Sequence, residues 1–322
     1  MTSNAASFVG NIPHYYDGGL GPVIFVDYAA DMARRVGARP VSRVLETAAG
    51  TGIVSRQLRD VLPANAQLTA TDLNPPMIEV ARTKFQSSEK VDLRSADAMA
   101  LPFPDGAFDA VVCQFGVMFF PDRAKSYQEV NRVLAPGGCY LFNVWDSHRY
   151  NPFGRIAHEV AGSFFPANPP QFYNVPFSCH QIDPIKESLI DAGFGDLQIA
   201  VVRLEKKIPN VESFARGLVY GNPLIDQIRE RGGVDPDRVV GGVLEALHRE
   251  FGADESSDLH GGEDGAIFVL RLQYFATRQR RFTGGVTSAL GRCCRKSLFP
   301  WLNTNSPSRR RGDLINVWGR HY

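Results

Sequence analysis

The chain has 322 residues, which at roughly 150 residues per domain suits one large domain or one domain with a substantial addition. Apolar residues make up 44% and charged residues 21%, and these values exclude collagen-like, coiled-coil and wholly disordered chains. No apolar run reaches the ~18 residues of a membrane helix, and the N-terminus lacks the features of a secretory signal. Five cysteines without a C-x-x-C pair argue against a disulfide framework or a zinc site. We therefore expect a cytoplasmic protein with no membrane span and no bound metal.

The formal net charge of +1 hides a basic C-terminal segment. Residues 276–322 carry ten Lys and Arg side chains against a single acid, Asp313. Hydrophobic periodicity fades after Thr277, which predicts a disordered tail over residues 277–322. With Trp301 and Trp318, this tail could bind RNA or anionic lipid by charge and stacking. A solvated extension without a partner is the simpler interpretation, and it makes nucleic acid an unexpected ligand.

In chain order, apolar residues at helical spacing predict a first helix over residues 26–36, ended by Gly37 and Pro40. Short apolar strands are then predicted at residues 43–46, 67–72, 91–94, 110–115 and 139–145. Helices are predicted between them at residues 54–62, 76–85 and 123–134, the last one stopped by P-G-G at residues 136–138. Strands that alternate with helices indicate a doubly wound α/β domain with a mostly parallel sheet covered on both faces.

The alternation continues more loosely in the second half of the chain. We predict a helix over residues 183–192, a sixth strand over 197–204, helices over 211–251 broken at 221–223, and a seventh strand over 266–276. Residues 211–265 are thus a helical insertion between two strands, which either covers an active site or only packs on the domain. The predicted organisation is a helical leader or lid at residues 1–40, a main domain at residues 41–276 and the basic tail.

A cofactor site is predicted where the first strand ends. The sequence E-T-A-A-G-T-G at residues 46–52 makes a turn of small residues that a ligand can approach closely. Asp72 ends the second strand, where its carboxylate can accept hydrogen bonds from both hydroxyls of a ribose or can cap the following helix. This pattern fits either a dinucleotide or S-adenosylmethionine (SAM).

Three features favour SAM. Ser55 stands where a dinucleotide-binding turn has its third glycine. Glu46 would repel a pyrophosphate but attract the ammonium and sulfonium charges of SAM. Asp97 follows the third strand, where it can accept from an adenine amino group while Met99 packs on the ring.

Residues 43–145 resemble the class I SAM-dependent methyltransferases. Within that class they are similar to the type 11 group, which includes the ubiquinone/menaquinone-biosynthesis C-methyltransferases. The resemblance lies in four motifs, E-T-A-A-G-T-G, T-D-L-N-P-P-M, S-A-D-A-M-A-L-P-F-P-D-G-A-F-D-A-V-V and R-V-L-A-P-G-G. It implies a seven-stranded Rossmann-like sheet with an antiparallel last strand. One departure is Ala48, where the family usually has glycine.

The resemblance also implies which residues hold SAM. The turn residues with Glu46 would surround the methionine portion, Asp72 would hold the ribose with Leu73 and Met77 beside it, and Asp97 would meet the adenine. Gln114 would line the floor beneath the sulfonium. The complete predicted set is Glu46, Ala48, Gly50, Thr51, Gly52, Asp72, Leu73, Met77, Asp97, Ala98 and Gln114.

Methyl transfer from a sulfonium is an in-line displacement that depends chiefly on alignment, and an oxygen or carbon acceptor also needs a base. Two polar clusters offer one. His14 and Tyr16 lie in a glycine-rich stretch that is either a lid over the cofactor or a surface loop capped by Asp17. His148 follows the fifth strand, where it serves either as a base or in a local turn.

The predicted activity is therefore methyl transfer from SAM to a small, partly apolar acceptor. An NAD(P)-dependent oxidoreductase on the same fold is the alternative enzyme, and binding through the basic tail is the alternative outside catalysis. The sequence does not predict the acceptor atom or the oligomeric state.

Overall fold

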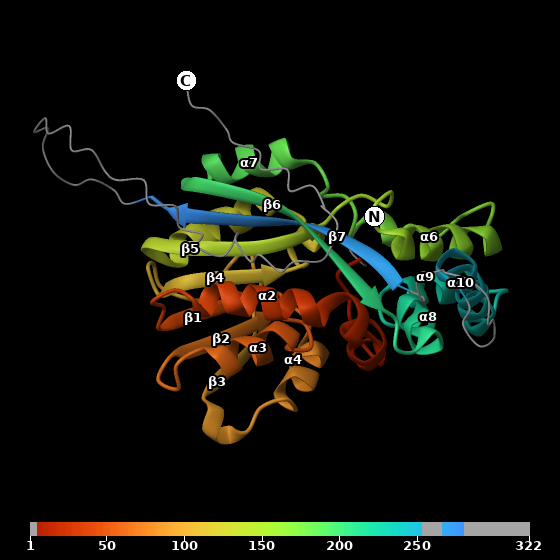
Figure 1. Cartoon of the computed structure of the whole chain (residues 1–322), viewed down its shortest axis with the longest axis horizontal. Coiled ribbons are helices and arrows are strands. Elements are labelled where there is room, and N and C mark those ends of the chain that lie inside the picture. The colour runs from red at the N-terminus through yellow and green to blue at the C-terminus, as the bar shows by residue number, and fades with distance from the viewer. Residues whose placement is uncertain (1–4, 253–265, 280–322) are drawn as a thin grey trace, which may run out of the picture.

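The computed structural model describes residues 5–252 and 266–279, and it centres on one sheet of seven strands (Figure 1). The strand order is β3-β2-β1-β4-β5-β7-β6. The strands are β1 (Arg43–Thr47), β2 (Gln67–Asp72), β3 (Val91–Ser95), β4 (Phe108–Gln114), β5 (Leu134–Trp145), β6 (Phe194–Lys207) and β7 (Ala266–Arg278). The predicted strands are all present, with bounds that differ by a few residues.

The sheet is mixed, and its one antiparallel strand is the last in the chain. β1 pairs in parallel with β2 and β4, β2 with β3, and β4 with β5. β7 runs antiparallel between β5 and β6. This arrangement confirms the doubly wound fold and the antiparallel seventh strand that the family resemblance implied.

Helices cover both faces of the sheet. On one face lie α2 (Val26–Gly37), α3 (Ile53–Val61) and α4 (Pro75–Arg82), whose apolar sides pack on alternate residues of the central strands. On the other face lie α5 (Arg123–Val133) and α7 (Ile182–Asp191), which pack against Tyr140 and Phe142 of β5. Short 3₁₀ turns occur at Ser87–Glu89, Val117–Phe119 and Phe172–Asn174.

Two predicted boundaries are wrong for identifiable reasons. The P-G-G segment was expected to separate a helix from a strand, but β5 already begins at Leu134 and carries those residues in an irregularity of its pairing with β4. β7 runs to Arg278, so residues 277 and 278 belong to a strand rather than to the predicted tail. Residues 280–322 of that tail, and residues 253–265 of the insertion, lie outside the described residues.

The N-terminal stretch around His14 and Tyr16, for which the sequence left open a lid over the cofactor or a surface loop, is helical. It forms α1 (Ile12–Tyr15) and then a π-helix, η1 (Tyr16–Phe25), which leads directly into α2. Pro22 lies inside η1, where its missing N–H weakens ordinary α-helical bonding. Gly19 meets Gly217 backbone to backbone, because a Cβ on Gly19 would lie only 2.8 Å from the Cα of Gly217.

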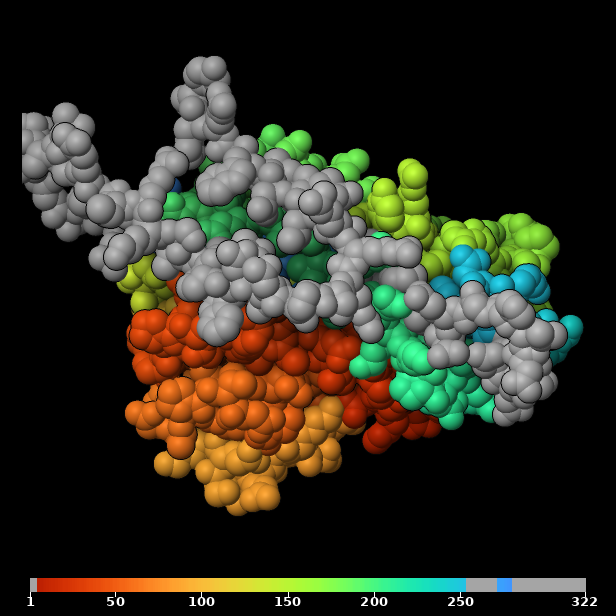
Figure 2. Space-filling view, in the orientation of Figure 1, coloured from red at the N-terminus to blue at the C-terminus, as the bar shows by residue number. Residues whose placement is uncertain are grey.

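The insertion forms three helices at one end of the sheet, beside η1 (Figures 1 and 2). They are α8 (Val211–Tyr220), α9 (Leu224–Arg231) and α10 (Pro236–Phe251), and the predicted break at residues 221–223 separates the first two. The sequence analysis missed α6 (Pro152–Phe164), which packs against α10. Within the described residues, no helix is both long and apolar enough to cross a membrane.

Candidate functional site

The end of β1 places a carboxyl group inside the protein. Glu46 is 1% exposed, and its Oε2 accepts a hydrogen bond from the Ser55 hydroxyl at the start of α3. Burial raises the pKa of Glu46 to about 8, and the charge of Asp72 adds to this effect. Glu46 is therefore mostly neutral at pH 7 and becomes a good partner for a cation only when it loses its proton.

The turn after β1 has an unusual backbone. Ala48, Gly50 and Gly52 have φ angles of 51°, 55° and 78°, in the left-handed region that glycine adopts freely. At Gly52 glycine is required also for space, because a Cβ would lie 2.9 Å from the Cβ of Ala81. Ala48 holds the same backbone form at a cost, and its methyl packs against Gly116, where an added Cβ would lie only 2.4 Å away.

Asp72 connects this turn to β2. Its Oδ2 accepts from the Gly50 amide at 2.9 Å and its Oδ1 from the Asn74 amide at 2.8 Å. Burial raises the pKa of this carboxyl, against hydrogen bonds from these amides that lower it. The N-cap position of α4 belongs to Asn74, so Asp72 supports the turn rather than capping the helix.

The remaining predicted cofactor residues lie along the same edge of the sheet. Leu73 is 58% exposed beside Asp72, whereas Met77 on α4 is buried. Asp97 accepts from the Met99 amide at 2.8 Å, and Ala98 is buried next to it. Asp97 therefore fixes its own loop.

A small cavity opens at this edge, in which the centre of a water molecule can reach about 20 Å³. Four of the predicted cofactor residues line it, namely Glu46, Ala48, Thr51 and Gln114, together with Tyr16, Phe25, Ala49, Ile53 and Val54. The other predicted cofactor residues and the two candidate histidines are not among the lining residues. Gln114 donates from Nε2 to the carbonyl of Phe25 at 3.2 Å, while its buried Oε1 has no partner within the described residues.

The N-terminal segment forms one side of this cavity. Tyr16 stacks on Phe25 with ring centroids 4.7 Å apart, and its Cε1 lies 3.9 Å from where a Cβ on Gly50 would be. Asp17 accepts from the Thr51 hydroxyl at 2.5 Å and forms an ion pair with Lys84. Residues 12–25 are therefore fastened onto the glycine-rich turn at two points.

Tyr16 is poorly suited to act as a base in this geometry. Burial raises the pKa of its hydroxyl, and the charges of Asp72, Asp17 and Glu46 raise it further. The phenol stays protonated at neutral pH, so it can donate a hydrogen bond but cannot readily accept a proton. The neighbouring His14 is exposed.

His148 lies in a packed aromatic region. Its Nε2 lies 3.2 Å from the carbonyl oxygen of Tyr173, and its ring centroid lies 4.4 Å from that of Phe177. Burial lowers the pKa of this imidazole, and the nearby His158 lowers it further. A neutral ring can act as a base, but a hydrogen bond to a carbonyl fixes its Nε2 as a donor.

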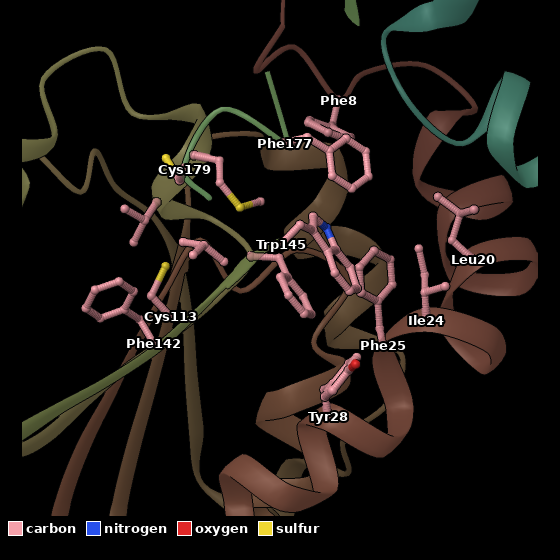
Figure 3. Packing of buried hydrophobic residues seen from close by; sticks show 14 of the residues in the cluster. Phe8, Leu20, Ile24, Phe25, Tyr28, Cys113, Phe142, Trp145, Phe177 and Cys179 are labelled. Carbon is pink, nitrogen blue, oxygen red and sulfur yellow. The ribbon is translucent and has the colours of Figure 1, made fainter. Parts of the chain in front are cut away.

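The sequence analysis did not single out Trp145 as part of this edge. The Trp145 ring stacks on Phe115 at a centroid distance of 3.6 Å, and both contact Phe25 and Tyr28. Figure 3 shows Trp145 beside Phe25 and Tyr28. Phe115 reaches this position through a positive φ of 55° immediately after β4. The aromatic wall therefore depends on a backbone conformation that residue patterns do not reveal.

The residues present suit SAM. A buried carboxyl that can pair with an ammonium, a turn of small residues and an acid at the end of β2 supply the contacts that its methionine and ribose parts need. No group of three or more His, Cys, Asp or Glu side chains in the described part of the chain could hold a metal ion.

Comparison with known proteins supports the same assignment. A family model described as "Methyltransferase domain" matches residues 45–142. The chain is 46% identical over 97 residues to the demethylmenaquinone methyltransferase of Thermus thermophilus, covering 30% of this chain and 44% of that protein. It is 36% identical over 108 residues to the ubiquinone/menaquinone biosynthesis C-methyltransferase UbiE of a Geobacter strain, covering 33% of this chain and 46% of that protein. The chain thus spans less than half the length of these two relatives.

Solved structures share the fold at low sequence identity. Phosphoethanolamine N-methyltransferase 2 of Haemonchus contortus, solved with SAM, has a TM-score of 0.51 at 17% identity, covering 83% of this chain and 57% of that chain. The YcgJ protein of Bacillus subtilis has a TM-score of 0.50 at 18% identity, covering 79% and 99%. None of these relatives supports the alternative of an NAD(P)-dependent oxidoreductase or of a nucleic-acid or lipid binder. Over residues 45–142, the chain carries a class I, SAM-dependent methyltransferase domain.

Proposed function

We propose that this protein transfers the methyl group of SAM to a small, partly apolar acceptor by in-line displacement. The observation that carries the proposal is the buried Glu46 carboxyl beneath the turn that Asp72 holds in place. When bound, SAM supplies an activated methyl group on a positively charged sulfur. The chain's own task is to fix that sulfur in line with the acceptor, and such alignment can lower a barrier by ~7–11 kcal/mol.

In this proposal each residue of the edge has a separate task. Ionised Glu46 pairs with the ammonium of the methionine part, and the turn around Gly50 brings the backbone close to it. Asp72 accepts from the ribose in addition to the two amides that it already holds. Asp97, Ala98, Leu73 and Met77 border the adenine.

The N-terminal residues 1–40 act as the lid. Tyr16 and Asp17 cover the turn, so η1 has to move away from Gly50 and Thr51 before a molecule as large as SAM can enter a cavity of only about 20 Å³. Once closed, the lid excludes water from the sulfonium. The helices of residues 211–252 and the aromatic wall of Phe115 and Trp145 border the acceptor in this proposal. This apolar border is the reason for proposing a partly apolar acceptor.

The acceptor class can be narrowed by the relatives. The names of the Thermus and Geobacter proteins describe methylation of quinone precursors, and a flat aromatic ring would suit the Trp145 wall. His148 and His14 remain the proposed groups for proton removal from such an acceptor. Tyr16 lines the cavity, where its protonated phenol can orient the acceptor by donating a hydrogen bond but does not remove its proton.

The decisive experiment is calorimetric titration with SAM, S-adenosylhomocysteine and NAD(P)H. Micromolar binding of the first two is expected, and Asp72→Ala should abolish it, while Asp92→Ala on the exposed part of β3 should not. Binding of NAD(P)H alone would refute the proposal. Transfer of labelled methyl to a panel of quinols, phenols and lipophilic acids, with protein and RNA as controls, then identifies the acceptor class.

A further inference from the structure

A line of buried polar side chains crosses the sheet beside the cofactor cavity. The strand register places Gln114 of β4 opposite Asn143 of β5, and Asn143 opposite Gln273 of β7. Arg271 lies two residues from Gln273 on β7 and so faces the same side of the sheet. We call Gln114, Asn143, Gln273 and Arg271 the polar row.

The N-terminal helices cover the polar row. Arg271 donates from Nη2 to Asp31 of α2 at 2.6 Å, and its guanidinium lies 4.2 Å from the ring centroid of Tyr28. Gln273 donates to the same Asp31 oxygen at 3.4 Å. At the other end Gln114 donates to the carbonyl of Phe25. The row is therefore enclosed between the sheet and the segment η1–α2.

Most of the polar atoms in this row lack a protein partner within the described residues. Asn143 is 0% exposed, yet neither its Oδ1 nor its Nδ2 is hydrogen-bonded. The same is true of Gln114 Oε1, Gln273 Oε1, and Arg271 Nε and Nη1. Six unpartnered polar atoms in one enclosed place would cost more than the net stability of an ordinary domain, so these atoms must bind something polar.

Water fits this place better than part of a substrate. The stacked rings of Phe115 and Trp145 close the row on the side of the acceptor wall. Ala110, Val112 and Leu141 close it on the other side with buried apolar packing. Water is small enough for such a space, and it both donates to amide oxygens and accepts from amide and guanidinium N–H groups.

We propose that the polar row binds a chain of water molecules that joins the cofactor cavity, at Gln114, to the ion-pair cluster around Asp31. Gln114 lines the cavity and reaches the row with its unpartnered Oε1. Asp31 pairs with Arg34, Arg35 and Arg271, and the Arg34 side chain is 61% exposed. The chain of water molecules therefore connects a covered site to the solvent.

Such a connection has a use at the proposed site. Gln114 lines the cofactor cavity, and water bound to its buried Oε1 fixes the orientation of this amide, whose Nε2 donates to Phe25. The cationic Arg271 in the row, together with Arg34 and Arg35 at Asp31, opposes the passage of a proton, so the water chain orients side chains and does not conduct protons. The role toward the cofactor rests on the proposed methyl transfer, whereas the water chain itself does not.

Nuclear magnetic resonance of the full-length, ¹⁵N-labelled protein tests the water chain without any substrate. The side-chain NH₂ of Asn143 should show magnetisation transfer from water. The NH₂ of Asn222 is the control in the same spectrum, because it is also buried but is hydrogen-bonded to Tyr173 and Leu218. A water signal at Asn143 and none at Asn222 is expected, and two equally silent amides would overturn the proposal.

A second measurement counts the water molecules. Oxygen-17 relaxation dispersion reports long-lived buried water, and Asn143→Leu should lower its amplitude by at least one molecule per protein. An unchanged amplitude in a folded variant contradicts the chain, and the wild-type spectra decide alone if the variant does not fold. A protein that shows the water signal but does not bind SAM would refute the proposed function and leave the water chain intact.

Discussion

Glu46→Gln removes the one titrating group that we place against the ammonium of SAM, while an amide keeps the shape of the carboxyl. Burial raises the pKa of Glu46 to about 8, so only about one carboxyl in ten is ionised at pH 7 and one in a hundred at pH 6. If the ionised form binds SAM, wild-type affinity carries a penalty of about 1.4 kcal/mol for each pH unit below 8. The variant carries no such penalty, because it cannot ionise.

Calorimetry at pH 6, 7, 8 and 9 measures this effect as the ratio of wild-type to variant affinity. The amino group of SAM titrates with a pKa of about 8, and only the wild type prefers its ammonium form, so the slope of the ratio is read between pH 6 and pH 8, where this amine is mostly protonated. The ratio should fall about tenfold per pH unit below 8 and approach one near pH 6. Titrations in buffers of different ionisation enthalpy should show proton release with the wild type at pH 7 and less with Glu46→Gln.

The same pKa shift predicts that Glu46→Gln, which weakens SAM binding, makes the folded protein more stable. The folded pKa of Glu46 lies above the unfolded value of 4.5, so its stabilising contribution is complete below pH 4.5 and is lost as the pH rises to about 8. Relative to wild type, Glu46→Gln should therefore gain thermal stability between pH 5 and pH 8.5. A ratio of affinities that stays constant from pH 6 to pH 9 would refute the reasoning.

Three further predictions concern the turn, the lid and the base. Ala48→Gly should raise the free energy of unfolding in urea by about 0.5–1 kcal/mol, because glycine adopts the left-handed backbone of position 48 without strain. The control Ala49→Gly should lower that free energy, and equal effects of the two changes would argue against strain at Ala48. Asp17→Asn should speed SAM association in stopped-flow fluorescence several-fold by loosening the contacts with the turn, and an unchanged rate would mean that the lid does not limit entry. If His148 is the base, His148→Asn should lower kcat by about 100-fold or more and leave SAM affinity unchanged, whereas the control His158→Asn should leave kcat unchanged. A kcat of His148→Asn within a few-fold of wild type would show that His148 is not the base.

The sequence predicted the sheet well because its strands are short apolar runs bounded by glycine and proline. The order of elements from Arg43 to Trp145 follows the family motifs, and the helix of residues 236–251 showed its apolar stripe. The helix α6 was missed although Phe153, Ile156, Ala157 and Val160 recur at helical spacing. That stripe begins immediately after a run of polar residues, and the sequence analysis interpreted this region as a turn.

The cover over the cofactor edge was only one of the two alternatives that the sequence left open for the N-terminal stretch. Residues 16–25 contain three glycines and a proline, a composition that is typical of loops, yet they form a π-helix in which Gly19 fits closely against α8. The partners of Asp72 and the polar row depend on strand register, which brings together residues far apart in the chain. Local patterns carry no information on such pairings.

The contact between Gly19 and Gly217 leaves no side chain to absorb a displacement. The two backbones touch directly, so a movement of η1 away from the turn requires that η1 slides along α8 or that α8 moves with it. In the proposed function, entry of the cofactor and the shape of the acceptor side thus depend on the same contact. A bulky residue at position 217 would push η1 and α8 apart, and it would affect both cofactor binding and acceptor binding.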